Sequence, residues 1–177
     1  MGREEEENEM ESHAITPKFY YIKTPLNKYT FKMPKIRKWV ESIAEGYCLN
    51  LFAGMTKLNL NEVRNDIREE MNAEYHLDAL DFCKQWTGNK FDTVILDPPY
   101  SYRKSMEMYG GKITSPFNIL KDEILNIITE NAIVITFGYH SVSMGSVRGF
   151  KTEGICLMSH GGAIHDTIAT VERRKTK

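Results

Sequence analysis

The chain has 177 residues, 41% of them hydrophobic and 27% charged, which is enough to bury the core of one globular domain. No apolar run approaches the roughly eighteen residues that cross a bilayer, and no charged and then apolar leader opens the chain. We therefore expect a cytoplasmic protein with no membrane partner.

The net charge of −1 is unevenly distributed. Residues 1–12 contain six glutamates and one arginine, a net charge of −5, so the rest of the chain carries +4. A glutamate run without apolar periodicity is typical of a solvated tail. We expect residues 1–18 to form an acidic, disordered tail and residues 19–177 to form a single domain. The mildly basic domain is compatible with a nucleic-acid partner.

The predicted elements alternate between helices and strands. Pro34 suits the first turn of a helix, and Ile36, Trp39 and Val40 follow it at helical spacing. In chain order we expect an extended aromatic arm over 19–31, a helix over 34–45, a strand over 47–52, a weaker strand over 61–66, a helix over 77–86, a strand over 91–96, a helix over 115–129, a strand over 132–137, and a hairpin of strands 149–159 and 165–174 joined at 160–165.

This alternation predicts an α/β fold with a mostly parallel sheet, helices on both faces and an antiparallel hairpin strand at the end. In such sheets ligands bind at the carboxyl ends of the strands. Gly54, Asp97 and Gly138 each follow a predicted strand, so we expect all three at one edge of the sheet.

The cysteine and histidine spacings predict no metal site. The three cysteines form no CxxC pair and have apolar neighbours, so we expect buried, reduced thiols at Cys48, Cys83 and Cys156. The histidines of the C-terminal part lack the tight spacing of a ligand pair: His140, His160 and His165.

The stretch LDPPYS, residues 96–101, ends a predicted buried strand with an acid, two prolines and an aromatic. Prolines have a fixed φ and no N–H, so they hold the neighbouring carbonyls rigidly. The Asp97 carboxylate and the Pro98 carbonyl can then accept both hydrogens of a planar amino group, and Tyr100 offers a face for a base ring. The pattern favours attack by an exocyclic amino nitrogen over the alternative, a turn that merely ends the strand.

LDPPYS resembles the catalytic D-P-P-Y motif of the amino-group-directed, S-adenosylmethionine-dependent methyltransferases, which include N6-adenine and N4-cytosine DNA enzymes and several RNA enzymes. LNLFAG, residues 49–54, is similar to their first motif, a strand and Gly-rich turn that approaches the methyl donor. The resemblance runs from about residue 20 to residue 173. It implies a Rossmann-like class I methyltransferase fold and S-adenosyl-L-methionine as the cofactor.

The resemblance implies a donor site drawn from several segments. Phe52, Ala53 and Gly54 would form the turn under the methionine part of the donor. Asp66 would bind the ribose hydroxyls, and Asp78 would meet the adenine amino group. The other implied donor contacts are Leu77 and Ala79 beside the adenine, Thr24 and Pro25 at the methionine end, and Asp97 between donor and acceptor.

On the acceptor side, the resemblance implies catalytic roles for Asp97, Pro98, Pro99 and Tyr100. Asp97 and Pro98 would hold the target amino group, while Tyr100 would stack on the target base. Four further residues are candidates for substrate contact: Arg103 and Lys104 near a phosphate, and the loop histidines His140 and His160 near the base.

The chain departs from the family pattern in three respects. The first motif of the family usually has a second glycine, whereas Met55, Thr56 and Lys57 follow Gly54 here. Asp66 lies twelve residues beyond Gly54 instead of about twenty, so we expect the first crossover helix to be cut to a turn or two, with Glu62 as a rival ribose ligand. Only about forty residues follow Gly138, too few for the large target-recognition domain that the DNA enzymes normally carry.

Three functions remain open on these residues. We place an N6-adenine DNA methyltransferase first, acting with a separate recognition subunit or as a homodimer. An RNA methyltransferase for adenine or guanine amino groups gains from the missing recognition domain. The lost glycine and the short crossover favour a third interpretation, a non-catalytic partner subunit with a methyltransferase fold. The intact D-P-P-Y motif argues against it.

Overall fold

The computed structural model describes residues 16–98, 116–162 and 165–175. Most of the predicted acidic tail lies outside the described residues. So do four of the predicted site residues, namely Pro99, Tyr100, Arg103 and Lys104.

One sheet of seven strands organises the described residues, in the order β1-β6-β7-β5-β4-β2-β3. The strands are β1 (Lys18–Lys23), β2 (Cys48–Asn50), β3 (Glu62–Arg64), β4 (Phe91–Leu96), β5 (Ile128–Gly138), β6 (Phe150–Ser159) and β7 (Thr167–Arg174). Neighbouring strands are parallel except at β7, which runs antiparallel to both β5 and β6. The predicted α/β sheet and its antiparallel hairpin strand are therefore confirmed.

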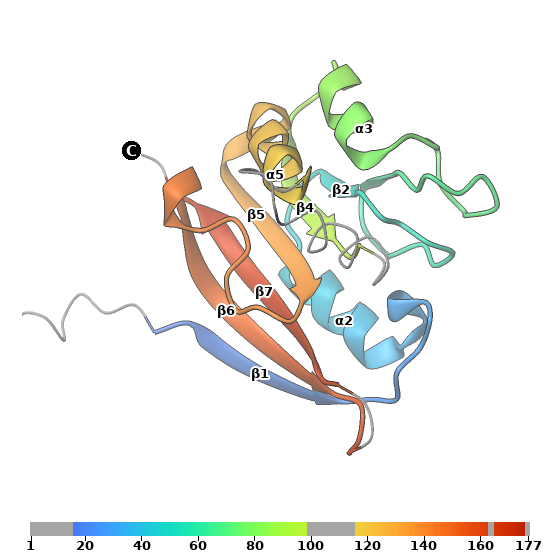
Figure 1. Cartoon of the computed structure of the whole chain (residues 1–177), viewed down its shortest axis with the longest axis vertical. Coiled ribbons are helices and arrows are strands. Elements are labelled where there is room, and N and C mark those ends of the chain that lie inside the picture. The colour runs from blue at the N-terminus through green and yellow to red at the C-terminus, as the bar shows by residue number, and fades with distance from the viewer. Residues whose placement is uncertain (1–15, 99–115, 163–164, 176–177) are drawn as a thin grey trace, which may run out of the picture.

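Helices cover both faces of this sheet (Figure 1). Helix α2 (Pro34–Ile43) packs on one face, whereas α3 (Ala79–Gln85) and α5 (Pro116–Ile127) pack on the other. Two 3-10 turns, η1 (Thr30–Lys32) and η2 (Ser146–Arg148), lie in the connections. None of the helices in the described part of the chain is long and apolar enough to cross a membrane.

Each face of the sheet has its own apolar core. Under α2, the predicted stripe of Ile36, Trp39 and Val40 packs with the buried side chains of β5 and β7. Under α3 and α5, Phe82 and Leu120 pack with the opposite face of β2, β4 and β5. The burial of both faces explains why the central strands read as continuous apolar runs.

All three cysteines are buried and free, as predicted. Burial raises the thiol pKa of Cys48 to about 11 and the thiol pKa values of Cys83 and Cys156 to about 12. The thiols therefore stay protonated near neutral pH and are poor nucleophiles there.

The aromatic arm predicted over 19–31 contains a strand that the prediction missed. Residues Lys18–Lys23 form β1, which pairs in parallel with Gly154–Ser159 of β6 at the edge of the sheet. Tyr20 and Ile22 face the α2 core, whereas Phe19 and Tyr21 point to solvent. Inward and outward side chains therefore alternate along β1. Because both faces of the strand carry aromatic residues, hydropathy does not reveal this alternation.

The boundary between α5 and β5 also differs from the prediction. The helix ends at Ile127, two residues early, and the strand begins at Ile128, four residues before the predicted start. Both isoleucines are buried, and no glycine or proline separates them. An unbroken apolar run does not reveal where a helical period becomes a strand period.

The first predicted helix ends at Ile43 instead of residue 45, with Ala44 as its C-cap. Gly46 then turns the chain into β2 with φ +61°, and a Cβ atom there would meet the Asp92 carboxylate. That carboxylate accepts the Tyr47 N–H at 2.9 Å. Strands β2 and β3 and helix α3 are each one or two residues shorter at each end than predicted.

Candidate active site

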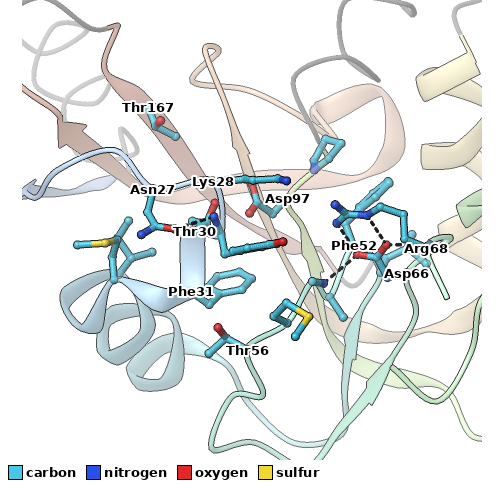
Figure 2. A pocket seen from close by; sticks show the side chains of 18 of the residues that line it. Asn27, Lys28, Thr30, Phe31, Phe52, Thr56, Asp66, Arg68, Asp97 and Thr167 are labelled. Carbon is cyan, nitrogen blue, oxygen red and sulfur yellow. Dashed lines mark hydrogen bonds and ion pairs between the residues drawn. The ribbon is translucent and has the colours of Figure 1, made fainter. Parts of the chain in front are cut away.

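A cavity of about 820 Å³ opens at the carboxyl ends of β2, β3 and β4. Most of the predicted donor residues line it: Pro25, Phe52, Ala53, Gly54, Asp66, Leu77, Asp78, Ala79 and Asp97. Pro98, predicted to hold the acceptor amino group, lines it as well. Figure 2 shows Asp97 between Asn27, Lys28 and Thr30 on one side and Phe52, Asp66 and Arg68 on the other. The topology therefore brings these distant segments together.

The turn after β2 forms the floor of the cavity. Ala53 is buried, and Gly54 adopts a left-handed conformation with φ +57°. A Cβ on Gly54 would lie 3.9 Å from Tyr29, so the backbone conformation, rather than space, favours glycine here. The Gly54 N–H donates to Asp66 Oδ2 at 2.9 Å, which joins the turn to the end of β3.

Asp66 is buried, and both of its carboxylate oxygens accept hydrogen bonds. Besides Gly54, its carboxylate accepts from the Arg68 N–H and Nε, both at 3.1 Å, and from Nη2 at 3.2 Å. Burial alone would raise the Asp66 pKa, but the hydrogen bonds from Arg68 and Gly54 outweigh it and lower the pKa below its ordinary value. Asp66 is therefore a fixed anionic acceptor at the cavity wall.

Glu62, the rival of Asp66, has a different place in the structure. Its side chain is fully buried and accepts from the Leu58 N–H at 2.9 Å and from Arg64 Nη1 at 2.8 Å. Glu62 is outside the cavity lining, whereas Asp66 is part of it. The geometry thus favours Asp66 over Glu62 as a ligand-binding acid.

Residues 51–61, between β2 and β3, contain no helix, so the expected turn or two of crossover helix is wrong. Arg64, which is 1% exposed, holds this connection together instead. Its guanidinium donates to the carbonyls of Ala53 (3.3 Å), Gly54 (3.0 Å) and Thr56 (2.8 Å), and also to Asn72 and Glu62. These bonds satisfy carbonyls that a helix would otherwise have engaged.

Arg64 and Asn65 support the cavity, and the sequence reasoning missed both. The Asn65 side chain accepts from the Leu77 N–H at 3.1 Å and donates to the carbonyls of Leu77 (3.0 Å) and Leu51 (3.3 Å). It thereby fixes the segment that leads into Asp78. The available signal was two strongly polar residues in and beside a predicted strand, because polar side chains that are buried need hydrogen-bond partners.

Asp78 is the N-cap of α3 as well as a cavity residue. Its Oδ1 accepts from the N–H groups of Leu80 at 2.9 Å and Asp81 at 3.4 Å. No hydrogen bond to its Oδ2 occurs among the described residues, and Leu77 and Ala79 flank it in the cavity lining. The second carboxylate oxygen is available to a ligand.

Asp97 and Pro98 directly follow β4 and line the cavity. Leu96 and Pro98 are buried, while Asp97 is half-buried. The buried strand and the proline fix the direction in which Asp97 leaves the sheet. The acidic part of the predicted acceptor pair therefore lies in the same cavity as the predicted donor turn.

Three predicted site residues have more limited contact with the cavity. Thr24 is buried behind the wall, with its N–H bonded to the Ser159 carbonyl at 3.0 Å, and His140 is exposed and outside the lining. His160 lines the cavity, but its ring contacts the Thr24 carbonyl at 3.0 Å and Thr167 Oγ1 at 2.9 Å. These bonds give His160 a structural role between β1 and β7.

Solved structures share this fold at low sequence identity. TrmN from Thermus thermophilus aligns with a TM-score of 0.58 and 12% identity over 81% of this chain and 49% of its own. The N-methyltransferase NodS from Bradyrhizobium japonicum WM9 aligns with 0.53 and 10% over 77% and 90%. A structure described for the conversion of a disulfide bond into a thioacetal group in echinomycin biosynthesis aligns with 0.52 and 13% over 80% and 81%.

The fold is thus Rossmann-like, as predicted, and is shared with a methyltransferase of known structure. This chain spans about half the length of the TrmN chain. No protein-family model matches the sequence, and no curated protein matches it.

Proposed function

We propose that this protein is an S-adenosylmethionine-dependent methyltransferase that modifies an exocyclic amino group of a nucleic-acid base, N6 of adenine in DNA first among them. One observation carries the proposal. The segments ending at Gly54, Asp66, Asp78 and Asp97, far apart in the sequence, line a single cavity of about 820 Å³. Their residue types are those that an amino-directed methyl transfer requires.

The residues of the cavity fit a nucleoside-containing donor. The left-handed turn at Gly54 lets the backbone approach the ligand closely, and the anionic Asp66 suits ribose hydroxyls. Asp78 Oδ2 suits an adenine amino group, with Leu77 and Ala79 beside the ring. When bound, S-adenosylmethionine would supply an activated methyl group on its sulfonium.

Asp97 and Pro98 would orient the acceptor amino group. The Asp97 carboxylate and the Pro98 carbonyl each accept one hydrogen of the amino group, which directs its nitrogen lone pair toward the donor side of the cavity. Positioning of this kind supplies about 7–11 kcal/mol in well-oriented reactions. The Asp97 carboxylate then receives the amino proton.

A base paired inside a duplex cannot reach such a cavity, so the acceptor is single-stranded or flipped out of the helix. We propose nucleic acid as the partner, DNA ahead of RNA, in the cytoplasm. A separate recognition subunit or a second copy of the chain would select the sequence.

The test is incubation of the protein with methyl-labelled donor and separate pools of DNA and RNA. We expect label in DNA, recovered as N6-methyladenine after digestion to nucleosides. Label in RNA would move the acceptor to that polymer. Donor binding by calorimetry without label in either pool would indicate a binding subunit, and the absence of donor binding would overturn the proposal.

A further inference from the structure

Residues 16–40 carry six lysines and one arginine but no aspartate or glutamate. A stretch of this length with seven basic residues and no acid is unusual in a chain whose overall net charge is −1. In the fold this stretch forms β1, η1 and the first turns of α2. Its charge is therefore concentrated on one part of the molecule.

The stretch also forms one wall of the candidate active site. Pro25, Lys28, Tyr29 and Phe31 line the cavity, and Lys28 and Thr30 face it beside Asp97 in Figure 2. This wall is formed by the β1–α2 connection, and its Tyr29 ring lies near the turn at Gly54. The basic stretch thus borders the entrance that an acceptor would use.

We call four exposed lysines of this stretch the rim lysines: Lys23, Lys28, Lys32 and Lys35. Of these four, Lys28 lines the cavity. Lys35 Nζ donates to the Lys23 carbonyl at 3.2 Å, so the end of β1 and the start of α2 share one rim. The ammonium groups of Lys28 and Lys32 each lie 5.5 Å from the centroid of the Tyr29 ring, which lines the cavity.

The rim lysines are not neutralised within the described part of the chain. The ion pairs found there belong to the arginines Arg64, Arg68, Arg148 and Arg173. Clustered ammonium groups repel one another and condense counterions, and a polyanion that replaces these counterions gains binding free energy from their release.

The form of the rim favours a chain of phosphates over a single small anion. The lysines are exposed and are spread along β1, the connection that follows it, η1 and α2, and none is a buried side chain in a pocket for one phosphate. Aromatic rings lie among them: Tyr29 between two lysines, and Tyr139, which is 41% exposed, elsewhere on the cavity lining. Basic tracks with interleaved aromatics are typical of single-strand binding.

We propose that the rim lysines bind the phosphodiester backbone of a single-stranded nucleic acid and so guide one base into the cavity. The inference rests on the proposed function, because the strand held here would carry the acceptor base. It adds the surface on which the strand lies and the direction of approach, from the β1–α2 wall.

The test uses fluorescence anisotropy with labelled oligo(dT) and oligo(U) of about 16 nucleotides. Thymine and uracil have no exocyclic amino group, so binding reports on the backbone and not on an acceptor base. The variant is Lys23→Gln/Lys32→Gln/Lys35→Gln; Lys28 is left intact because it also lines the cavity. The matched control is Lys84→Gln/Lys90→Gln/Lys175→Gln, which removes the same charge from exposed sites toward the amino edge of the central strands.

We expect the rim variant to bind at least about tenfold more weakly than wild type, and its slope of log affinity against log salt to fall by about 2, because each lost phosphate contact on a single strand removes about 0.7. The control should stay within about twofold of wild type. Equal loss in both triple variants, no loss in the rim variant, or no oligonucleotide binding by wild type would overturn the inference.

These outcomes are separate from those of the methyl-transfer assay. If wild type transfers label but the rim variant binds oligonucleotides normally, the proposed activity is supported and the role of the rim lysines is wrong. If the rim variant loses oligonucleotide binding but wild type transfers no label, the role of the rim lysines is supported and the proposed activity is wrong.

Discussion

Asp78 has two tasks at one position, and substitution can separate them. Its Oδ1 caps α3, while the side chain also lines the cavity. Serine is as good an N-cap as aspartate but has no carboxylate, whereas alanine has neither property.

We expect Asp78→Ala to lower the free energy of unfolding by about 1 kcal/mol through the lost cap. Asp78→Ser should keep that stability, yet both variants should bind S-adenosylhomocysteine about tenfold more weakly, as expected for a lost hydrogen bond to a charged group. Urea unfolding and calorimetry measure the two effects. Asp81→Ala, at an exposed position in the same first turn, is the control. Unchanged ligand affinity in Asp78→Ser would remove Asp78 from the donor site.

Asp97→Asn keeps the shape of the side chain and removes its charge and proton-accepting capacity. We expect methyl transfer to fall by at least about a hundredfold, in the range typical of a lost general base, while the donor dissociation constant changes little. Single-turnover kinetics with labelled donor and calorimetry would separate these quantities. Near-normal turnover would show that Asp97 does not orient the amino group.

At the residue scale, the sequence predicted the residues that line the cavity better than the residues that hold them in place. Asp66, Asp78 and Asp97 could be predicted because each lies within two residues of the end of an element, at a position that the family resemblance implies. The supporting roles of Arg64 and Asn65 could not be specified, because most of their partners are backbone carbonyls and amides, up to fourteen residues away. A sequence pattern does not show which carbonyls a fold leaves unsatisfied.

At the scale of elements, the connection from β2 to β3 is the distinctive feature. It returns the chain to a parallel strand without a helix, and the buried Arg64–Glu62 pair replaces the packing that a helix would provide. Removing one partner of a buried pair leaves an uncompensated charge, which costs more than the pair itself contributes.

We therefore expect Arg64→Met to lower the free energy of unfolding by about 3–5 kcal/mol. Adding Glu62→Gln should restore part of the loss, because it removes the unpaired carboxylate. Arg37→Met on α2 serves as a control and should stay within about 0.5 kcal/mol of wild type. Chemical denaturation measures all three; a loss in Arg64→Met no greater than that in Arg37→Met would contradict the supporting role.

Element types were easier to predict than element boundaries. The stripes of α2 and α5 and the β-branched run of β4 gave the right structures, because each repeats over at least six residues. The α5–β5 boundary was misplaced because apolar residues continue through it. Strand β1 was missed because β6, the strand with which it pairs, lies near the other end of the chain.

At the scale of the whole molecule, acid should weaken the fold through two carboxylates. The hydrogen bond from Arg173 lowers the pKa of Glu45, and the bonds from Arg68 and Gly54 lower that of Asp66 against the effect of burial. The unfolded chain then takes up protons at a higher pH than the folded chain does. The stabilisation is complete above the ordinary carboxylate pKa of about 4 and is lost as pH falls through the lower folded values.

We expect the urea midpoint to be flat near neutral pH and to decrease below about pH 4. Asp66→Asn should be less stable at neutral pH and should show a shallower decrease in acid. A series of urea titrations on both proteins measures the slopes. Parallel slopes for the two proteins would mean that Asp66 has an ordinary pKa in the folded chain.

The alternation of strands and helices was sufficient to predict the sheet as a whole, since parallel connections leave few arrangements. It could not predict where the N-terminal strand lies. Lys18 is paired with Gly154, 136 positions later, and nothing local in either segment specifies that contact.

That pairing has a consequence for synthesis. At about 5–20 residues per second, β1 leaves the ribosome on the order of ten seconds before β6 exists. During this interval Phe19, Tyr20, Tyr21 and Ile22 form an apolar strand without a partner, open to other nascent chains. Lys18 and Lys23, at its two ends, place a positive charge on each side of the run and disfavour such association until β6 arrives.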